Sequence, residues 1–179
     1  MIPSDPLRGG PAGIQGVDAV SANTCTPGGT KINWQALEEF FFNTDPNKVL
    51  QSQGLSFYKG IPVFTIEGER SGSFGAIFLT KKAKGAVDGT DTLRHEYGHT
   101  IQLAKLGVLK FSVCVGLPSW QNWGDDSYYK DYYNKPWEIM ADVYGGVQSR
   151  THDQKFINEG IHYEQRSQGL GPFVWMFIE

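Results

Sequence analysis

Two histidines and a glutamate lie within five consecutive positions of this chain. The stretch from residue 91 to residue 102 reads DTLRHEYGHTIQ and contains His95, Glu96 and His99. On a helix, positions four apart lie on one face, so both imidazoles can reach a single metal ion. Glu96 lies beside that face, where its carboxylate can take a proton from water at the metal without binding the metal itself. The spacing therefore predicts a metal site equipped with a general base.

A helix must hold these residues, and the surrounding sequence suits one. Thr90 or Asp91 is a suitable N-cap, and we expect the helix to run to Gly107. We expect this helix to have three faces. The apolar face carries Leu93, Tyr97, Ile101 and Ala104, and the opposite face carries His95, His99, Gln102 and Leu106. A narrow stripe with Arg94, Gly98 and Lys105 is left for solvent. Histidines on a buried face need partners, and a metal ion would supply one. The glycine at position 98 suggests that another segment packs closely there.

The third ligand of a catalytic metal has to come from elsewhere in the chain. Catalytic zinc sites usually use three protein ligands and leave a fourth position to water. Lys105 and Gln102 stand where the metzincin pattern requires histidine and glycine, which excludes that class. Downstream, PWEIMADVYGG follows a helix-initiating Asn-Lys-Pro and places Glu138 and Asp142 on one helical face. Glu138 is a candidate third ligand, although a surface glutamate on an amphipathic helix would show the same spacing.

An H-E-x-x-H motif followed by a second helix with E-x-x-x-D resembles the gluzincin clan of zinc metallopeptidases. The resemblance implies a role for each residue: His95, His99 and Glu138 as ligands of one Zn²⁺, Glu96 as general base, and Asp142 as a carboxylate that orients a ligand histidine. The last role is physically reasonable, because a ligating imidazole commonly donates its other N–H to a carboxylate.

A closer likeness covers residues 91 to 148. RHEYGHTIQ, LPSW and YYNKPWEIMADVYGG are similar to a minimal metallopeptidase domain at the C-terminal ends of bacterial Rhs-type repeat proteins. By this resemblance we expect a zinc-dependent peptidase, and an endopeptidase in particular, with a zincin-like α+β fold. Its partner would be a peptide or protein substrate.

The elements around the motif predict how that fold is built. INWQALEEFFFN is a candidate helix capped by Asn33, and a second short helix should start at Pro46. LSFYKG, IPVFTIEG and SFGAIFLTK read as three strands between residues 55 and 81. We expect one small, mostly antiparallel sheet, with the helix of residues 91–106 across it and the helix of residues 135–147 alongside. The two helices should approach closely at the small residues Gly98, Ala141, Gly145 and Gly146, although Gly145 and Gly146 could equally just end the second helix. Glu138 should then lie within about 4 Å of both histidine rings, as in a preformed site.

Composition limits the remaining possibilities. The first thirty residues are rich in Gly and Pro and read as a flexible extension or linker, which leaves residues 31–179 as a single domain. The resemblance implies that this is a metallopeptidase domain. The net charge is −3, with scattered Lys and Arg, so we expect no nucleic-acid partner. No apolar run approaches the roughly 20 residues of a membrane span, and no signal peptide is visible. We expect a monomer that does not bind membranes; its location is open, with secretion or surface display as part of a larger precursor as one possibility.

Several features bear on substrate binding without a motif of their own. The stretch SGSFGAIFLT is the candidate edge strand for substrate, with Gly72 and Gly75 allowing a backbone to approach. The tyrosine-rich residues 125–135 would wall a groove or simply pack as a loop. Candidate donors to the oxyanion are Tyr144, Arg150, His152 and His162.

Two other functions are compatible with the same motifs. One is a non-catalytic binding module in which zinc only ties two helices together, and the other is a self-processing or effector domain released from a larger protein. A retained Glu96 argues against the module, because a purely structural site has no use for a base and normally has four protein ligands. Cys25 and Cys114 are too few for a disulfide scaffold.

Overall fold

The structure, a computed structural model, describes residues 33–121 and 132–170. Contacts divide the chain after Leu37, and the folded unit considered below begins at Glu38. The helices are α1 (Trp34–Phe41), α2 (Pro46–Gln51), α3 (Lys81–Gly85), α4 (Gly89–Phe111), the π-helix η2 (Ser112–Gly116), α5 (Leu117–Gln121), the 3₁₀-helix η4 (Tyr132–Asn134), α6 (Pro136–Gly145) and α7 (Gln154–Gly169). The strands are β1 (Ser56–Tyr58), β2 (Ile61–Ile66), β3 (Gly72–Ser73) and β4 (Ile77–Thr80).

The first two predicted helices are confirmed, and their caps have clear causes. The side chain of Asn33 accepts a hydrogen bond from the Ala36 N–H at 3.0 Å, as an N-cap does. Asp45 caps α2 in the same way, and Pro46 takes the first helical position, where its missing N–H costs nothing. The predicted extension of residues 1–30, including Cys25, lies outside the described residues.

The sheet is mixed, with strand order β1-β2-β4-β3. β1 and β2 form an antiparallel hairpin whose turn residues Lys59 and Gly60 both have positive φ, as the tight primed turns require. β3 and β4 are also antiparallel, but the central pair β2 and β4 is parallel. The prediction of a mostly antiparallel sheet was therefore wrong for its centre. The reason is the route of the chain, which leaves β2, forms β3 at the far edge, and only then returns through β4.

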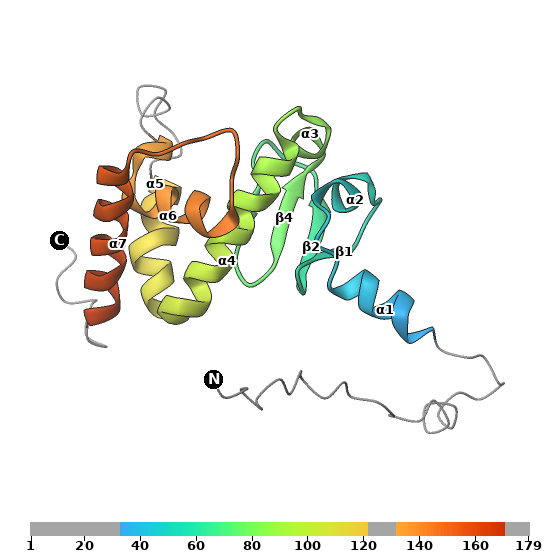
Figure 1. Ribbon diagram of the computed structural model, residues 1–179, viewed down its shortest axis with the longest axis horizontal. Helices are drawn as coiled ribbons and strands as arrows, with labels where there is room; N and C mark the ends of the chain where they lie inside the picture. Colours follow the sequence, from blue (N-terminus) through green and yellow to red (C-terminus); the bar gives the residue numbers. More distant parts are fainter. Residues whose placement is uncertain (1–32, 122–131, 171–179) are drawn as a thin grey trace, which may run out of the picture. The chain divides into compact units, whose positions relative to one another are not determined.

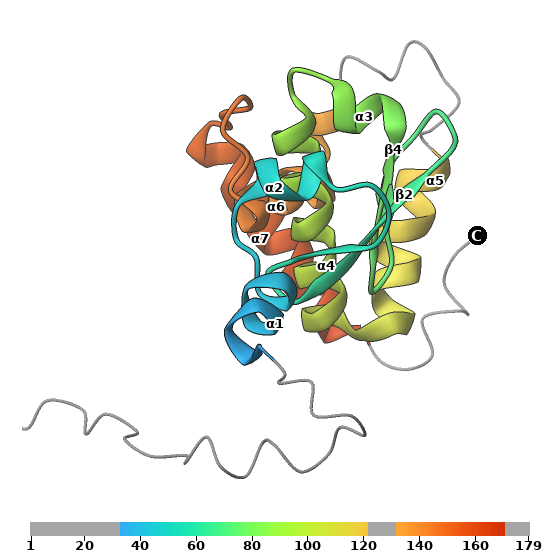
Figure 2. The ribbon, with the colours of Figure 1, turned by 90° about the vertical axis from the view of Figure 1, so that its right-hand side faces the viewer.

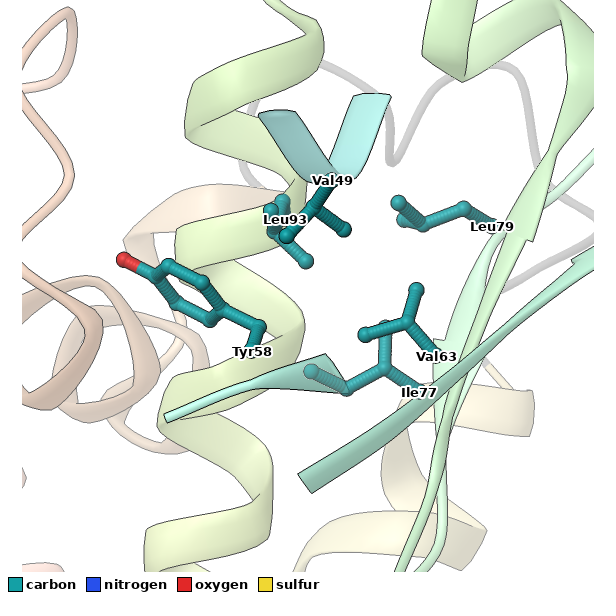
Figure 3. Close-up of a cluster of buried hydrophobic side chains, with 6 residues drawn as sticks. All are labelled: Val49, Tyr58, Val63, Ile77, Leu79 and Leu93. Carbon is teal, nitrogen blue, oxygen red and sulfur yellow. The ribbon is translucent and has the colours of Figure 1, made fainter. Parts of the chain in front are cut away.

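Alternating side chains of these strands build a core against α4. Val63, Ile77 and Leu79 point to the helical side, where they pack with Leu93 of α4. Figure 3 shows these side chains converging with Val49 of α2 and Tyr58 of β1 between the helix and the sheet. All six are at most 2% exposed. Burying a side chain of this size contributes about 1.5–3 kcal/mol, so this cluster fixes the position of α4 on the sheet.

Helix α4 lies between the sheet on one side and α6 and α7 on the other (Figure 1; Figure 2 gives the perpendicular view). It begins at Gly89, before both predicted caps. Asp91 instead accepts hydrogen bonds from the N–H groups of Gln148 and Ser149, in the segment that follows α6. Its carboxylate thus serves backbone donors distant in sequence rather than those of its own helix.

The predicted end of the motif helix at Gly107 is confirmed as a break. Gly107 has φ 76° and ψ 162°, outside the helical region, and helical structure resumes after it. Leu93 and Tyr97 pack on the sheet as predicted, whereas Ala104 is exposed, so the apolar face is shorter than expected. Gly98 was assigned to the solvent stripe and is instead buried.

One helical stretch within the described residues, Gly89–Gln121, is long and apolar enough to cross a membrane by length and composition alone. The same test is passed by core helices of soluble proteins, and this stretch carries the motif histidines and the break at Gly107. The expectation that the chain has no membrane partner stays a prediction.

Candidate metal centre

Helices α4 and α6 bring His95, His99 and Glu138 together. The Nε2 atom of His95 lies 3.0 Å from Oε2 of Glu138, and Nε2 of His99 lies 3.3 Å from the same oxygen. The three potential ligand atoms are all within 4.8 Å of one another, and all three residues are buried. The predicted approach of Glu138 to both rings is confirmed, and this buried group could hold a metal ion.

Small residues make the close crossing of the two helices possible. A Cβ atom at Gly98 would lie 1.9 Å from the carbonyl oxygen of Ala141, and a Cβ at Gly145 would lie 1.9 Å from that of Arg94. Each helix therefore uses a glycine where the other presents its backbone. Gly146 has a different role: with φ 73° it is the left-handed cap that ends α6. The predicted close approach is confirmed for Gly98, Ala141 and Gly145 but not for Gly146.

Asp142 holds His95 from the side opposite to Glu138. Nδ1 of His95 lies 2.6 Å from Oδ1 of Asp142, so this nitrogen carries a proton and donates a hydrogen bond to the carboxylate. Arg150 donates to both oxygens of Asp142, at 2.6 and 2.8 Å, and His152 Nε2 lies 2.9 Å from Oδ2. With Nδ1 protonated, the lone pair of neutral His95 is on Nε2 and faces Glu138.

Gln102, which the H-E-x-x-H motif does not include, holds His99 in the same way. Nδ1 of His99 lies 2.7 Å from Oε1 of Gln102, whose amide nitrogen donates to the carbonyl of Trp137 at 2.8 Å. Because the NH₂ group is used by Trp137, the amide oxygen is left for the histidine. This contact was readable from the sequence only in that Gln102 follows His99 by three residues and lies on the same predicted helical face.

Two hydroxyl groups fix the other end of the Glu138 carboxylate. Ser119 donates to Oε1 at 2.6 Å, and the Tyr132 hydroxyl hydrogen-bonds to the same carboxylate. Oε2, which faces the histidines, has no hydrogen-bond partner although it is buried. Burial, together with the charge of Glu138, raises the pKa of Tyr132, so its hydroxyl remains a neutral donor. Ser119 lies in the LPSW stretch and Tyr132 in the YYNKPWEIMADVYGG stretch, but neither stretch indicated a contact with Glu138.

The electrostatics of this group favour positive charge between the rings. Burial alone would lower the pKa of His95, but the hydrogen bond with Asp142 and the nearby charge of Glu138 outweigh it and raise that pKa to about 10. Burial would raise the pKa of Glu138, and the neighbouring histidines hold it well below its ordinary value. The pKa of Asp142 is also lowered, against burial, by His95 and Arg150.

These contacts give a direct test of whether a metal ion fits. Both histidines use Nδ1 as a donor, so in the neutral form both Nε2 lone pairs face a carboxylate oxygen that has no hydrogen bond of its own. Three electron pairs directed at one point repel one another unless a proton or a cation lies between them. Two imidazoles and one carboxylate are also a ligand set found in catalytic metal sites. The residues present therefore fit a divalent metal ion.

Glu96 lies next to this group without belonging to it. The residue is 6% exposed, and its Oε2 has no hydrogen-bond partner. It lines two cavities, of about 320 Å³ and about 200 Å³, which also share His95. A carboxylate with one free oxygen at the wall of two cavities is in a position to exchange a proton with a bound molecule.

The four candidate oxyanion donors differ in where they lie. Tyr144 binds Lys105 and Glu164, and His162 is exposed on α7; neither lines the two cavities. His152 is held by Asp142. Arg150 lines the larger cavity, with its guanidinium 4.0 Å from the centre of the Tyr133 ring.

Two residues of the tyrosine-rich stretch do wall the site. Tyr132 lines both cavities and Tyr133 lines the larger one. Residues 125–131 of that stretch lie outside the described residues. The predicted edge stretch, residues 71–80, forms two strands instead of one. Its first part, β3 (Gly72–Ser73), is at an edge of the sheet and lines the smaller cavity, whereas β4 lies inside the sheet. Cys114 is a buried free thiol that lines neither cavity.

No family model, curated protein or solved structure matches the chain. The resemblance to gluzincin peptidases and to the Rhs-associated domain therefore rests on the motifs themselves.

Proposed function

We propose that this chain is a zinc-dependent peptidase in which Glu96 is the general base. One observation carries the proposal: a buried His-His-Glu group lies beside a second buried carboxylate, Glu96, that opens onto the same cavities. A structural zinc site normally has four protein ligands, whereas three ligands with an adjacent base suit hydrolysis.

The ligands in this proposal are His95, His99 and Glu138, and the ion is one Zn²⁺. When bound, the zinc supplies a Lewis acid that polarises a carbonyl group and lowers the pKa of water to about 7. Asp142 and Gln102 keep the two rings in the tautomer that leaves Nε2 free. The outer hydrogen bonds of such ligands typically change metal affinity or activity by about 10- to 100-fold.

Glu96 moves the proton. Its free oxygen takes a proton from the attacking water and delivers it to the nitrogen of the cleaved peptide bond, which leaves as an amine. Tyr132 is the donor that we assign to the oxyanion, because its side chain lines both cavities and its hydroxyl stays neutral. In this structure the hydroxyl donates its one proton to Glu138, and in this proposal it turns that proton to the oxyanion when substrate is bound.

Metal analysis combined with a Glu96→Gln variant tests the proposal. The wild-type protein should bind one zinc ion and cleave peptides, and Glu96→Gln should keep the zinc while its turnover falls by several orders of magnitude. Glu159→Gln is the matched control, because Glu159 is an exposed glutamate of α7 outside both cavities.

Two results would reject it. Bound zinc with no cleavage of any peptide would favour the non-catalytic module. A Glu96→Gln variant that keeps more than about a tenth of the activity would show that Glu96 is not the base.

A further inference from the structure

The two cavities that meet at Glu96 differ in chemistry. The larger one, about 320 Å³, is walled by charged side chains of both signs: Glu69, Arg70, Lys82, Asp88 and Arg150. The smaller one, about 200 Å³, is walled by Phe74, Phe111, Val115 and Trp120. Both cavities share Ser71, His95, Glu96 and Tyr132, so a chain segment passing the metal group would enter one cavity on each side.

The smaller cavity, called the apolar pocket below, has a buried floor and an exposed rim. Phe111 and Val115 are 3% and 2% exposed, whereas Phe74 and Trp120 are 53% and 65% exposed. Aromatic rings connect the rim to the metal group. The ring centres of Phe74 and Phe111 are 6.0 Å apart, and those of Phe111 and His99 are 6.3 Å apart. Exposed aromatic side chains beside a buried apolar floor are typical of a surface that a ligand covers.

Unpaired polar atoms at the same pocket indicate what kind of ligand this is. Ser73 Oγ and Glu96 Oε2 are buried and have no hydrogen-bond partner, and both residues line the apolar pocket. Ser73 belongs to β3, which pairs with β4 on one side only. A Cβ atom at the neighbouring Gly72 would meet nothing within 4 Å, so there is open space beside the strand. An extended peptide offers both the hydrogen-bonding groups and the strand geometry that this edge lacks.

We propose that this chain, acting as the peptidase proposed above, prefers peptides with a large apolar residue next to the cleaved bond. The side chain of that residue inserts into the apolar pocket. The residues on the other side of the bond lie along the larger cavity. Because its walls carry both positive and negative side chains, this cavity favours polar residues without preferring one charge. Water adds across the C–N bond: its oxygen goes to the acyl carbon, which becomes a carboxylate, and Glu96 passes a proton to the departing amine.

The size of the apolar pocket supports this assignment. An apolar cavity of about 150 Å³ is sufficient to bind a benzene ring. A pocket of about 200 Å³ therefore accommodates one side chain such as Phe, Leu or Met. Hydrophobic pockets typically discriminate between large and small apolar side chains by about 10- to 200-fold.

Gly116 offers a way to fill the pocket without disturbing its walls. The residue lines the pocket, and a Cβ there would lie 3.8 Å from the nearest atom, the Phe111 carbonyl oxygen, which is an ordinary contact. The test compares the wild type with Gly116→Leu on a random peptide mixture, with cleavage sites read by mass spectrometry. Gly169→Leu is the control, because Gly169 lines neither cavity and a Cβ there meets nothing within 4 Å.

The wild type and Gly169→Leu should favour Phe, Leu or Met over Ala at one position next to the cleaved bond, by about 10- to 100-fold. Gly116→Leu should reduce that preference to about onefold while still cleaving peptides with Ala there. Trp120→Ala, at the exposed rim, should weaken the preference even if Gly116→Leu does not fold.

Binding measurements separate this inference from the proposed function. Fluorescence anisotropy of two labelled peptides, alike except for Phe or Ala, is recorded on Glu96→Gln and on Glu96→Gln combined with Gly116→Leu. Cleavage without an apolar preference overturns the pocket assignment and leaves the peptidase. Preferential binding of the Phe peptide that Gly116→Leu abolishes, with no cleavage by the wild type, supports the pocket and rejects the peptidase. Neither cleavage nor preferential binding rejects both.

Discussion

Replacing Gly98 with alanine should separate the two site helices and weaken metal binding. The new Cβ would lie 1.9 Å from the carbonyl oxygen of Ala141, whereas real Cβ atoms essentially never come closer than 3.0 Å. Helices α4 and α6 must therefore move apart locally by about 1.1 Å, the difference between these two distances. The obstacle is backbone, so no side-chain rotation can relieve it. Glu138 lies on α6, and the histidines lie on α4.

The expected size of the effect follows from ligand geometry. Metal–ligand distances tolerate changes of only about 0.2 Å, so a shift of about 1 Å between the two helices exceeds that tolerance several-fold. Overpacking of this kind usually costs about 1–3 kcal/mol, reduced by roughly 0.5–1 kcal/mol because alanine favours a helix. For a chain of this size, 1 kcal/mol lowers Tm by about 2–4 °C.

Two measurements test this prediction. Competition with a chromophoric chelator gives the zinc affinity, and the Tm of the protein without zinc gives the loss of stability. Gly98→Ala should bind zinc at least about tenfold more weakly and melt several degrees lower. Gly145→Ala should behave alike, because its Cβ would meet the Arg94 carbonyl oxygen at 1.9 Å. Gly169→Ala is the control, since it meets no atom within 4 Å. A Gly98→Ala protein with wild-type Tm and zinc affinity would refute the close crossing of the helices.

Three further predictions concern the site and its support. Glu138→Ala should weaken zinc binding far more than Asp142→Ala, which should change it by only about 10- to 100-fold; isothermal titration with zinc decides, and the reverse order would exchange their roles. Tyr132→Phe should retain zinc but lower kcat by about 10²- to 10³-fold in a peptide hydrolysis assay, as loss of an oxyanion donor does, and unchanged kcat would remove Tyr132 from the mechanism. Burial would raise the pKa of Asp91, but hydrogen bonds from Ser149, Gln148 and Arg94 hold it at about 2, below its ordinary 3.8. Its contribution to stability is therefore present above about pH 4 and is lost as the pH falls towards 2, so urea unfolding should show a steeper acid loss for the wild type than for Asp91→Asn; equal slopes would contradict this.

The periodicity of the sequence was sufficient for the local features of the site. Because a helix repeats every 3.6 residues, the spacing of His95 and His99 places both on one face in any helix that contains them. The same property places Glu138 and Asp142 together on the second helix. Glycine at 98 and 145 indicated a close approach, since a residue without a side chain is otherwise unfavourable within a helix. The cap residues Asn33 and Asp45 were equally readable, because an N-cap acts on its own first turn.

Only the tertiary structure decided which partner each of these groups meets. Glu138 and Asp142 share a helical face, yet one lies at Nε2 and the other at Nδ1 of His95. That division depends on how α6 is placed along α4, which the glycine contacts fix and no local pattern encodes. Asp91 likewise does not cap its own helix and instead accepts hydrogen bonds from N–H groups more than fifty residues away in the sequence.

The sheet and the outer contacts of the site show the same limit. Aromatic and β-branched composition indicated β1, β2 and β4 but did not separate the short strand β3 from β4. Composition is also the same for parallel and antiparallel pairing, so the parallel centre was decided by the route of the chain between β2 and β4. Gln102, Ser119 and Tyr132 lie in stretches that carry the resemblance, but their partners could not be read from the sequence. Their hydrogen bonds arise because packing leaves a buried histidine or carboxylate with an unmet donor or acceptor. Sequence thus determined which side chains face the site on each helix, and long-range packing determined how they meet.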